Sequence, residues 1–537
     1  MATLDLLVRG GLVIDGSGRA GRVQDVGVQG GEIVAVGDLA QAEAAETVDA
    51  SGLVVTPGFI DMHSHSDLSI LRHPDATSRI VQGITTEVVG NCGHSAAPRA
   101  DGGAAVEGLD RDLVPDGVRP WWSLAEFAER VAAARPATNQ ALLVGHGTVR
   151  RAVMGYAAMR ASAAETTAMC DLVTAAMEDG AFGLSSGLIY APGAYAGTDE
   201  VVALARAAAA AGGRFYATHM RDEADGLFEA LDEALEIGRR ADLPVQVSHL
   251  KAAGVRQHGR IGEAIARIEA ARTAGFDVQA DFYPYEAGST GLGALLPPWL
   301  LEGGPARMVE RLGRADVRRQ VADEIERGLP GWWNPVGAMG GDWDRVLVTR
   351  VAADGGRSAQ GRRIGEIARE RGVSPLDAVA ELLAEAGGSV QIVIFMMTAE
   401  DVRTVAGTAW VSMGTDGSAI SPAVADRQLV HPRTYGTTAR FLADHAGVHR
   451  PTAWEEAVRR MTAMPAERLG LANRGRVAPG MRADLVVLDR AHVEDRATYA
   501  RPHVAPAGVE LVTVNGVVAL RAGQVTGARA GEVLRRA

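Results

Sequence analysis

The sequence predicts a chain of the α/β class, in which a TIM-like (β/α)8 barrel carries a small β-domain and an inserted segment. Three observations predict this arrangement. Strand–helix units repeat through the middle of the chain, β-rich segments lie at both ends, and one long stretch interrupts the strand–helix pattern. A length of 537 residues suits one large barrel with attachments.

The two chain ends read as short strands joined by tight turns. Residues 1–56 alternate apolar runs with turn pairs such as Gly30-Gly31, and residues 474–537 contain Asn515-Gly516, a strong β-hairpin signal. We expect these two segments to meet in one small discontinuous β-domain.

The middle segment, residues 57–473, is expected to form the barrel. Helical stretches such as 200–211 and 227–240 separate apolar runs of strand length, and about eight such units predict a closed parallel sheet. The candidate strands are Leu53–Ile60, Thr85–Gly90, Ala141–Gly145, Gly183–Ser185, Phe215–Thr218, Pro244–Ser248, Asp277–Ala280 and Trp410–Gly414.

Residues 288–344 break the strand–helix pattern. They are rich in proline, glycine and tryptophan, and they are too long for an ordinary strand-to-helix loop. We expect an insertion that folds over the barrel mouth as an active-site lid. Its apolar run at 295–300 is a weak hint of a preference for apolar substrates.

Composition excludes several classes of protein. The net charge of −12 argues against nucleic acid and against anionic membrane as main partners. No run of about 18 apolar residues is long enough to span a bilayer, and the N-terminus lacks the basic and apolar regions of a signal peptide. Two cysteines, Cys92 and Cys170, cannot form a disulfide framework. A cytoplasmic protein is expected.

Potential metal ligands recur where the predicted strands end. An apolar strand runs into His63-Ser-His65, whose alternate side chains share one face. Other candidate ligands follow later strands in the same way, and together the six candidates are His63, His65, Cys92, His219, His249 and Asp416. Because active sites of such barrels lie at the carboxyl ends of the strands, the six side chains should converge on one axis. Histidine with cysteine or aspartate suits Zn²⁺.

Lys251 is the one lysine among the 54 basic residues of the chain. It follows the candidate ligand His249 by two positions, and arginine cannot supply a compact ammonium group. Lys251 is therefore a candidate site residue.

Three other residues have weaker claims to a catalytic role. Gly183-Leu-Ser185-Ser-Gly187 fits the nucleophile-elbow pattern, but no helix pattern follows the serine, so a turn at the barrel mouth is the better interpretation. His146 follows an apolar run and is as readily structural as functional. Cys170 lies in a helical stretch and reads as a small core residue.

With these residues in place, the chain resembles the amidohydrolase superfamily, which has metal-bearing (β/α)8 barrels. Most members with two metals add a carboxylated lysine on an earlier strand, and this chain has none there. Cys92 would take that bridging place, which narrows the resemblance to the N-acyl-D-amino-acid deacylases, or D-aminoacylases. The matching segments span nearly the whole chain: 58–67, 90–93, 183–190, 218–223, 248–251, 281–285, 414–417 and 431–436.

The resemblance implies roles for the candidate residues. Cys92, His219 and His249 would hold one tightly bound zinc. A second, weaker metal position would share Cys92 and be lined by His63, His65 and Asp416.

The same resemblance implies a substrate and a mechanism. Lys251, Tyr190 and Tyr283 would bind the α-carboxylate of an N-acyl-D-amino acid. Metal-bound hydroxide would attack the amide carbonyl, with Asp416 as general base and then general acid. Selectivity for the D-enantiomer is implied by the resemblance alone.

Two alternatives remain beside this one. A cyclic amidase of the hydantoinase or dihydroorotase kind would usually need the carboxylated lysine, and a non-catalytic scaffold relative would tend to lose ligands that this chain keeps. Side-chain preference, the number of working metals, the oligomeric state and the roles of His146 and His431 are left open by the sequence.

Overall fold

A series of parallel strands runs through the middle of the protein. The computed structural model describes residues 3–100, 113–352, 358–424, 428–447, 450 and 452–536. Parallel pairing joins four strands in one sheet and six in another. The first sheet contains β6 (Phe59–Asp61), β7 (Ile84–Val89), β8 (Asn139–Leu142) and the C-terminal β22 (Val533–Leu534); the second contains β9 (Val144–Gly145), β10 (Gly183–Gly187), β11 (Phe215–His219), β12 (Val245–Val247), β13 (Val278–Phe282) and β17 (Val411–Met413).

Backbone hydrogen bonds connect the two sheets. Only Leu143 separates β8 from β9, and its N–H donates to the carbonyl of Val89 at 2.8 Å, so β8 and β9 occupy the place of one predicted strand. At the other end of the series, Met62 N–H donates to Met413 O at 3.4 Å and Asp416 N–H donates to His63 O at 2.7 Å. The chain after β6 is therefore bonded to the chain around the end of β17.

The predicted strand Leu53–Ile60 divides at Gly58. β5 (Val54–Pro57) joins the small sheet, whereas β6 starts the parallel series. A Cβ atom at position 58 would lie 2.2 Å from Thr85 Oγ1, so only glycine allows this close approach to the neighbouring strand. The other seven predicted strands are present at or within three residues of their expected bounds.

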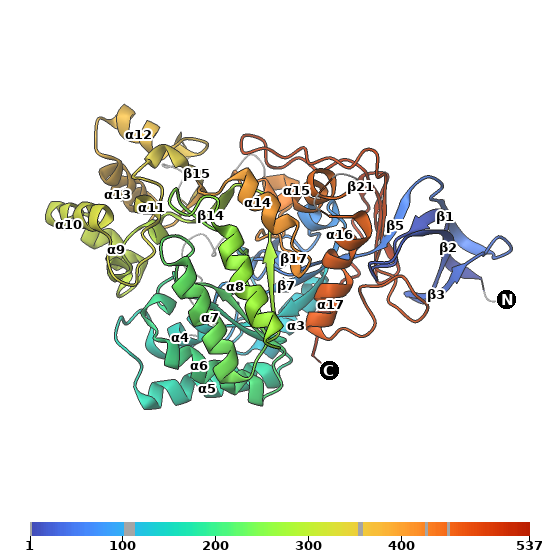
Figure 1. Ribbon diagram of the computed structural model, residues 1–537, viewed down its shortest axis with the longest axis horizontal. Coiled ribbons are helices and arrows are strands. Elements are labelled where there is room, and N and C mark those ends of the chain that lie inside the picture. The colour runs from blue at the N-terminus through green and yellow to red at the C-terminus, as the bar shows by residue number, and fades with distance from the viewer. Residues whose placement is uncertain are drawn as a thin grey trace.

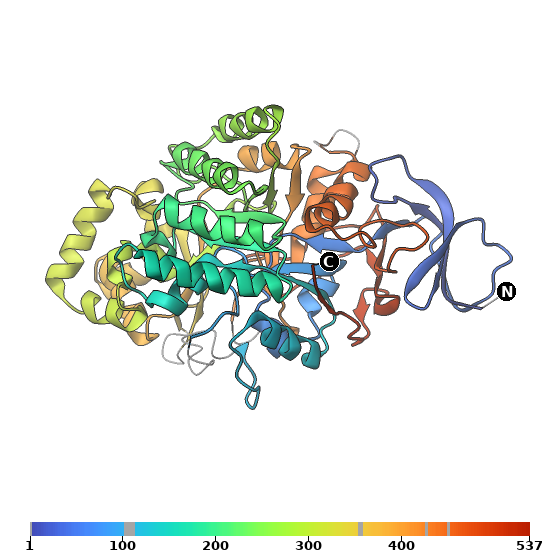
Figure 2. The same ribbon diagram turned by 90° about the horizontal axis from the view of Figure 1, so that it is seen from below.

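Helices follow several of the strands and lie around the parallel strands (Figures 1 and 2). The main ones are α5 (Ala163–Glu178), α6 (Thr198–Ala210), α7 (Leu227–Ala241) and α8 (Ile261–Thr273). In α7, Leu227, Leu231 and Leu235 recur every fourth residue and are all buried. None of the helices in the described part of the chain combines the length and apolar character needed to cross a bilayer.

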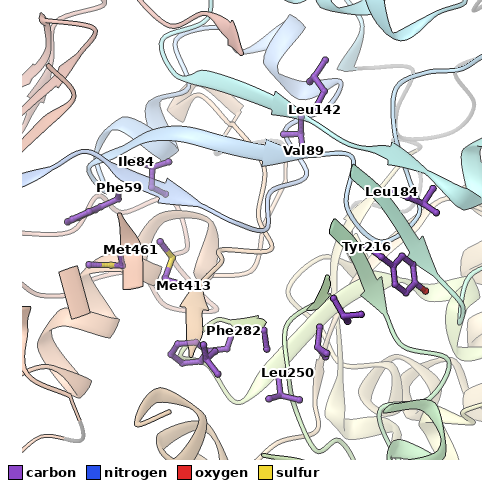
Figure 3. Packing of buried hydrophobic residues seen from close by; sticks show 14 of the residues in the cluster. Phe59, Ile84, Val89, Leu142, Leu184, Tyr216, Leu250, Phe282, Met413 and Met461 are labelled. Carbon is purple, nitrogen blue, oxygen red and sulfur yellow. The ribbon is translucent and has the colours of Figure 1, made fainter. Parts of the chain in front are cut away.

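The main core lies around the parallel strands. Phe59 of β6, Ile84 of β7 and Met413 of β17 are buried in one hydrophobic cluster, although they come from distant parts of the chain (Figure 3). This packing fixes the positions of the strand ends that follow, because close-packed interiors tolerate little displacement.

Both chain ends contribute to a separate nine-stranded sheet. β5 pairs antiparallel with β18 (Leu485–Leu488), which places the N-terminal and C-terminal strands in one layer. Asn515 and Gly516 both have positive φ, at 51° and 82°, and turn the chain between β19 (Val509–Val514) and β20 (Val517–Arg521). The hairpin predicted from this Asn-Gly pair is confirmed. Near the C-terminus the chain leaves this sheet, and β22 pairs with β8 of the first parallel sheet.

The predicted insertion is longer than 288–344. β14 (Ala287–Gly291), β15 (Val346–Val351) and β16 (Val390–Phe395) form one antiparallel sheet, so the segment continues to Phe395. α9 (Pro305–Leu312), α10 (Ala315–Arg327), α12 (Ile364–Arg371) and α13 (Pro375–Glu385) complete it. Its core is a second hydrophobic cluster. The insertion lies at the opposite end of the molecule from β1 (Leu4–Val13), β2 (Arg22–Gln29) and β3 (Glu32–Gly37) (Figure 1). Leu295 and Leu300 are buried in that cluster, which removes the basis for inferring apolar substrates from them.

Candidate metal centre

The six predicted ligands lie together at the carboxyl ends of the parallel strands. Their donor atoms form three overlapping groups, and within each group all donor atoms lie within 4.8 Å of one another. The groups are His63 with His65 and Cys92, Cys92 with His219 and His249, and His63 with His249 and Asp416.

The distances around Cys92 have the spacing of a tetrahedral zinc site. Cys92 Sγ lies 3.6 Å from His219 Nδ1 and 3.5 Å from His249 Nε2. Zinc bonds of about 2.3 Å to sulfur and about 2.0–2.1 Å to nitrogen, at a tetrahedral angle, would place sulfur and nitrogen about 3.5 Å apart. The donor set and its spacing therefore fit a zinc ion.

A second arrangement of donors surrounds Asp416. Its Oδ1 lies 3.1 Å from His65 Nε2 and 3.7 Å from His63 Nε2. Its Oδ2 lies 2.8 Å from Arg433 Nη1. His63 Nε2 is also 3.3 Å from Cys92 Sγ, so Cys92 is shared between the two arrangements. One carboxylate oxygen of Asp416 thus faces the cluster while Arg433 holds the other.

Electrostatics favour the ionised forms of the two anionic donors. Burial would raise the pKa of the Cys92 thiol, but the attraction of His63 and His249 outweighs it and holds that pKa well below its usual range. Burial likewise opposes ionisation of Asp416, whereas Arg433 and the hydrogen bond from His65 hold its pKa well below the ordinary value. Thiolate and carboxylate are the forms that bind metal.

Three of the candidate ligands have left-handed backbone conformations. Cys92, His249 and Asp416 have φ of 52°, 37° and 48°. Such conformations are uncommon for residues with a β-carbon and cluster at functional sites. Close packing accompanies them, since a Cβ atom at Gly187 would lie 2.1 Å from the carbonyl oxygen of Cys92. The turn around Cys92 therefore depends on the glycine at the end of β10.

The three predicted substrate residues lie beside the cluster. Lys251 is buried, and its Nζ lies 2.6 Å from Glu223 Oε1 and 6.0 Å from the centre of the Tyr283 ring. The ring centre of Tyr190 is 5.0 Å from that of His219, and the Tyr190 hydroxyl accepts a hydrogen bond from Thr290 at 3.3 Å. A cationic group and two phenols therefore border the candidate metal ligands.

Sequence reasoning missed three charged residues that contact the cluster. Glu223 touches His219 and His249, Asp281 Oδ1 lies 3.0 Å from His63 Nδ1, and Arg433 holds Asp416. Glu223 follows His219 by four positions, and Asp281 lies near the end of β13. Their position near strand ends is the signal in the sequence that could have identified them.

The residues with weaker claims have structural partners. Ser185 Oγ donates to Gly90 O and accepts from Gly93 N–H, so it holds the turn that carries Cys92. His146 lies outside the three groups, with its Nε2 2.9 Å from Glu200 Oε1.

His431 and Cys170 also lie outside the three ligand groups. His431 Nε2 donates to Ala287 O at 2.9 Å, and its Nδ1 accepts the N–H of Arg433 at 3.0 Å. Cys170 is a free, half-buried thiol on α5. His431 therefore helps to fix the backbone that carries Arg433.

Comparison with known protein families shows which family this chain belongs to. The model of the amidohydrolase family matches residues 46–520. The chain belongs to the amidohydrolase family. Along the chain of this amidohydrolase, the candidate ligands occur in the order His63, His65, Cys92, His219, His249 and Asp416. The resemblance drawn from the sequence was based on this order.

Characterised relatives cover the chain almost end to end. This amidohydrolase is 39% identical over 533 residues to the D-aminoacylase of Alcaligenes xylosoxydans xylosoxydans, covering 99% of this chain and 98% of the relative. It is 36% identical over 542 residues to the N-acyl-D-aspartate deacylase of the same organism, covering 99% and 95%.

A solved structure has the same mixed α/β fold. The N-acyl-D-glutamate deacylase of Bordetella bronchiseptica, complexed with zinc and a phosphonate inhibitor that mimics the tetrahedral intermediate, matches with a TM-score of 0.82 and 35% identity. The match covers 99% of this chain and 100% of that one.

Proposed function

We propose that this amidohydrolase is a zinc-dependent enzyme that hydrolyses the amide bond of N-acyl-D-amino acids, releasing a carboxylic acid and a free D-amino acid. The observation that carries the proposal is the group formed by Cys92, His219 and His249, whose spacing fits zinc, directly beside the one lysine of the chain. Similarity to D-aminoacylase and to an N-acyl-D-aspartate deacylase over nearly the full length supports it.

The proposal includes an architecture. The parallel strands form a (β/α)8 barrel within residues 57–473, and segments 1–56 and 474–537 supply the small β-domain. The backbone bonds between the chain after β6 and the end of β17 support closure of the barrel. The insertion acts as a lid, which is supported by the hydrogen bond from Thr290 of β14 to Tyr190 beside the cluster.

The metal roles follow the two arrangements of donors. Cys92, His219 and His249 hold the tightly bound zinc, because one thiolate and two imidazoles leave a coordination position open for water or substrate. His63, His65 and Asp416 line a second, weaker position and share Cys92. The 3.1 Å and 3.7 Å separations of the Asp416 carboxylate from the two imidazoles support that grouping.

The chain's own residues then perform the remaining steps. A bound zinc ion lowers the pKa of water and polarises an amide carbonyl. Asp416 is ionised at the outset, so its Oδ1 accepts the proton of the attacking water and then donates it to the departing nitrogen. Arg433 holds Oδ2 and keeps the carboxylate in place. Lys251, with Tyr190 and Tyr283, binds the α-carboxylate and so orients the scissile bond.

The geometry gives less support to a cyclic amidase. That chemistry would usually need a carboxylated lysine as a bridging ligand. Lys251 Nζ instead lies 2.6 Å from the Glu223 carboxylate, a distance typical of an ammonium in an ion pair. A non-catalytic scaffold would not need a complete donor set. A reducing compartment such as the cytoplasm, and the absence of nucleic-acid and membrane partners, stay predictions.

The test is a panel of N-acetyl-D- and N-acetyl-L-amino acids assayed with zinc-free and zinc-reconstituted protein. We expect release of D-amino acids only, and only by the reconstituted protein. The panel includes apolar and acidic side chains, which also determines the side-chain preference. Equal hydrolysis of both enantiomers, or full activity without metal, would contradict the proposal.

A further inference from the structure

Glu223 touches two of the proposed zinc ligands at once. Its Oε1 lies 2.9 Å from His249 Nδ1, and its Oε2 lies 3.3 Å from His219 Nε2. On each ring, the opposite nitrogen faces Cys92 Sγ: Nε2 of His249 and Nδ1 of His219. One carboxylate therefore lies on the far side of both imidazoles from the thiol.

This arrangement determines which nitrogen of each ring can bind metal. An imidazole binds metal through its unprotonated nitrogen, and its other nitrogen carries the proton and donates a hydrogen bond. We infer that Glu223 is a positioning residue that accepts a hydrogen bond from both imidazoles of the tight zinc site, one on each carboxylate oxygen, and so sets the tautomer and orientation of both. The inference rests on the proposed zinc role of Cys92, His219 and His249.

The surroundings of Glu223 suit this role. The residue is 2% exposed, and its negative charge is balanced by Lys251 Nζ at 2.6 Å. The same Nζ lies 2.6 Å from His249 Nδ1, so that nitrogen contacts both the ammonium and the carboxylate. Only the carboxylate can accept a hydrogen bond from it, because an ammonium group has no acceptor. His219 Nε2 is buried, and its one ion-pair partner within the described part of the chain is the Glu223 carboxylate, whose Oε2 lies 3.3 Å away. Without that carboxylate, the outward nitrogen of His219 would be left in a buried site with no acceptor.

The backbone holds Glu223 at the right distance from both strands. Glu223 lies in the loop between β11, which ends at His219, and α7. Its carbonyl accepts the N–H of Ala253 at 2.8 Å, which ties this loop to the segment that carries His249 and Lys251. The loop thus links the two strands whose histidines the carboxylate contacts.

Glutamine is the informative replacement. Its shape is nearly that of glutamate, but only one of its two terminal atoms accepts hydrogen bonds. Glu223→Gln can therefore satisfy one imidazole and must present an N–H group to the other. Loss of such an outer partner typically weakens metal binding by about 10- to 100-fold.

Two matched variants separate the alternatives. Asp281 holds the outward nitrogen of His63, at 3.0 Å, and touches neither outward nitrogen of the tight-site pair. Asp281→Asn removes a buried carboxylate at a similar depth and keeps an acceptor for the backbone N–H of His249. Lys251→Met removes the ammonium but keeps the Glu223 carboxylate beside the imidazoles of His219 and His249. This variant tests whether Glu223 acts only through Lys251.

The experiment measures the affinity of each metal-free protein for its first zinc equivalent by competition with a chromophoric chelator. We expect Glu223→Gln to bind about 10- to 100-fold more weakly than the parent, and Asp281→Asn and Lys251→Met to stay within threefold. The cobalt-substituted parent should show a thiolate charge-transfer band that Glu223→Gln alters. Unchanged affinity in Glu223→Gln, or an equal loss in Lys251→Met, would overturn the inference.

A second measurement needs no variant. Nitrogen-15 spectra of the histidines in the zinc-loaded parent should show His219 protonated at Nε2 and His249 protonated at Nδ1. The reverse tautomer at either ring would also overturn the inference. If the parent itself took up no zinc, the proposed function would fail instead, so the two failures are distinguishable.

Discussion

The replacement of Lys251 by arginine tests how the substrate is recognised. The ammonium is buried and contacts Glu223 Oε1 and His249 Nδ1, each at 2.6 Å, which leaves at least one of its three hydrogens for a substrate carboxylate. Charge is conserved in Lys251→Arg, but the longer planar guanidinium does not fit a position already enclosed by Glu223, His249 and Tyr283.

The magnitude follows from the kind of contact that is lost. A hydrogen bond to a charged group contributes about 1.5–3 kcal/mol, which corresponds to about 10- to 160-fold in kcat/KM. We expect that loss to appear mainly in KM for N-acetyl-D-amino acids, with the tight zinc retained.

The control for this prediction is a substrate with its α-carboxylate masked as an amide. This compound should be a poor substrate for the parent enzyme, and its kcat/KM should fall by less than about threefold further in Lys251→Arg. The comparison is a double-mutant cycle in which the substrate supplies one of the two changes. Steady-state kinetics on both substrates measures the cycle. An equal loss on both substrates, or loss of zinc in the variant, would refute the role of Lys251.

Three further replacements test other parts of the site. Asp416→Asn keeps the shape of the side chain but cannot accept a proton, so kcat should fall by roughly 10²- to 10⁴-fold in a folded protein; a change below threefold in steady-state assays would exclude the role. Cys92→Ala should lose the tight zinc in elemental analysis, because it removes the donor shared by both arrangements, and full zinc retention with activity would contradict the assignment. Ser185→Ala removes the two hydrogen bonds that hold the Cys92 turn, so denaturant unfolding should show a loss of about 1–3 kcal/mol while hydrolysis persists; complete loss of activity with zinc retained would instead indicate a nucleophile.

The sequence predicted the strand ends well because their signal is local. Apolar runs ending in a polar residue identify both a buried strand and the group at its end, as with Phe215–Thr218 followed by His219. The convergence of the ligands then follows from parallel pairing. The substrate and the D-enantiomer came from family resemblance, since no local pattern encodes them.

Long-range contacts were the main source of missed features. Glu223 acts across two strands and Asp281 reaches a ring 218 positions earlier in the sequence, so neither pairing is visible in a local pattern. The insertion was placed too short because the proline-, glycine- and tryptophan-rich stretch that marked it ends near residue 344, before the strand–helix unit of β15 and α12. Only the antiparallel pairing of β15 and β14 with β16 assigns that unit to the separate sheet.

X-ray absorption at the zinc edge tests the central claim most directly. With one zinc equivalent bound, we predict one sulfur scatterer at about 2.3 Å and two imidazole nitrogens at about 2.0–2.1 Å, the shell expected for Cys92, His219 and His249, and the sulfur should vanish in Cys92→Ala. A shell of oxygen and nitrogen alone in an active, zinc-loaded enzyme would contradict the account.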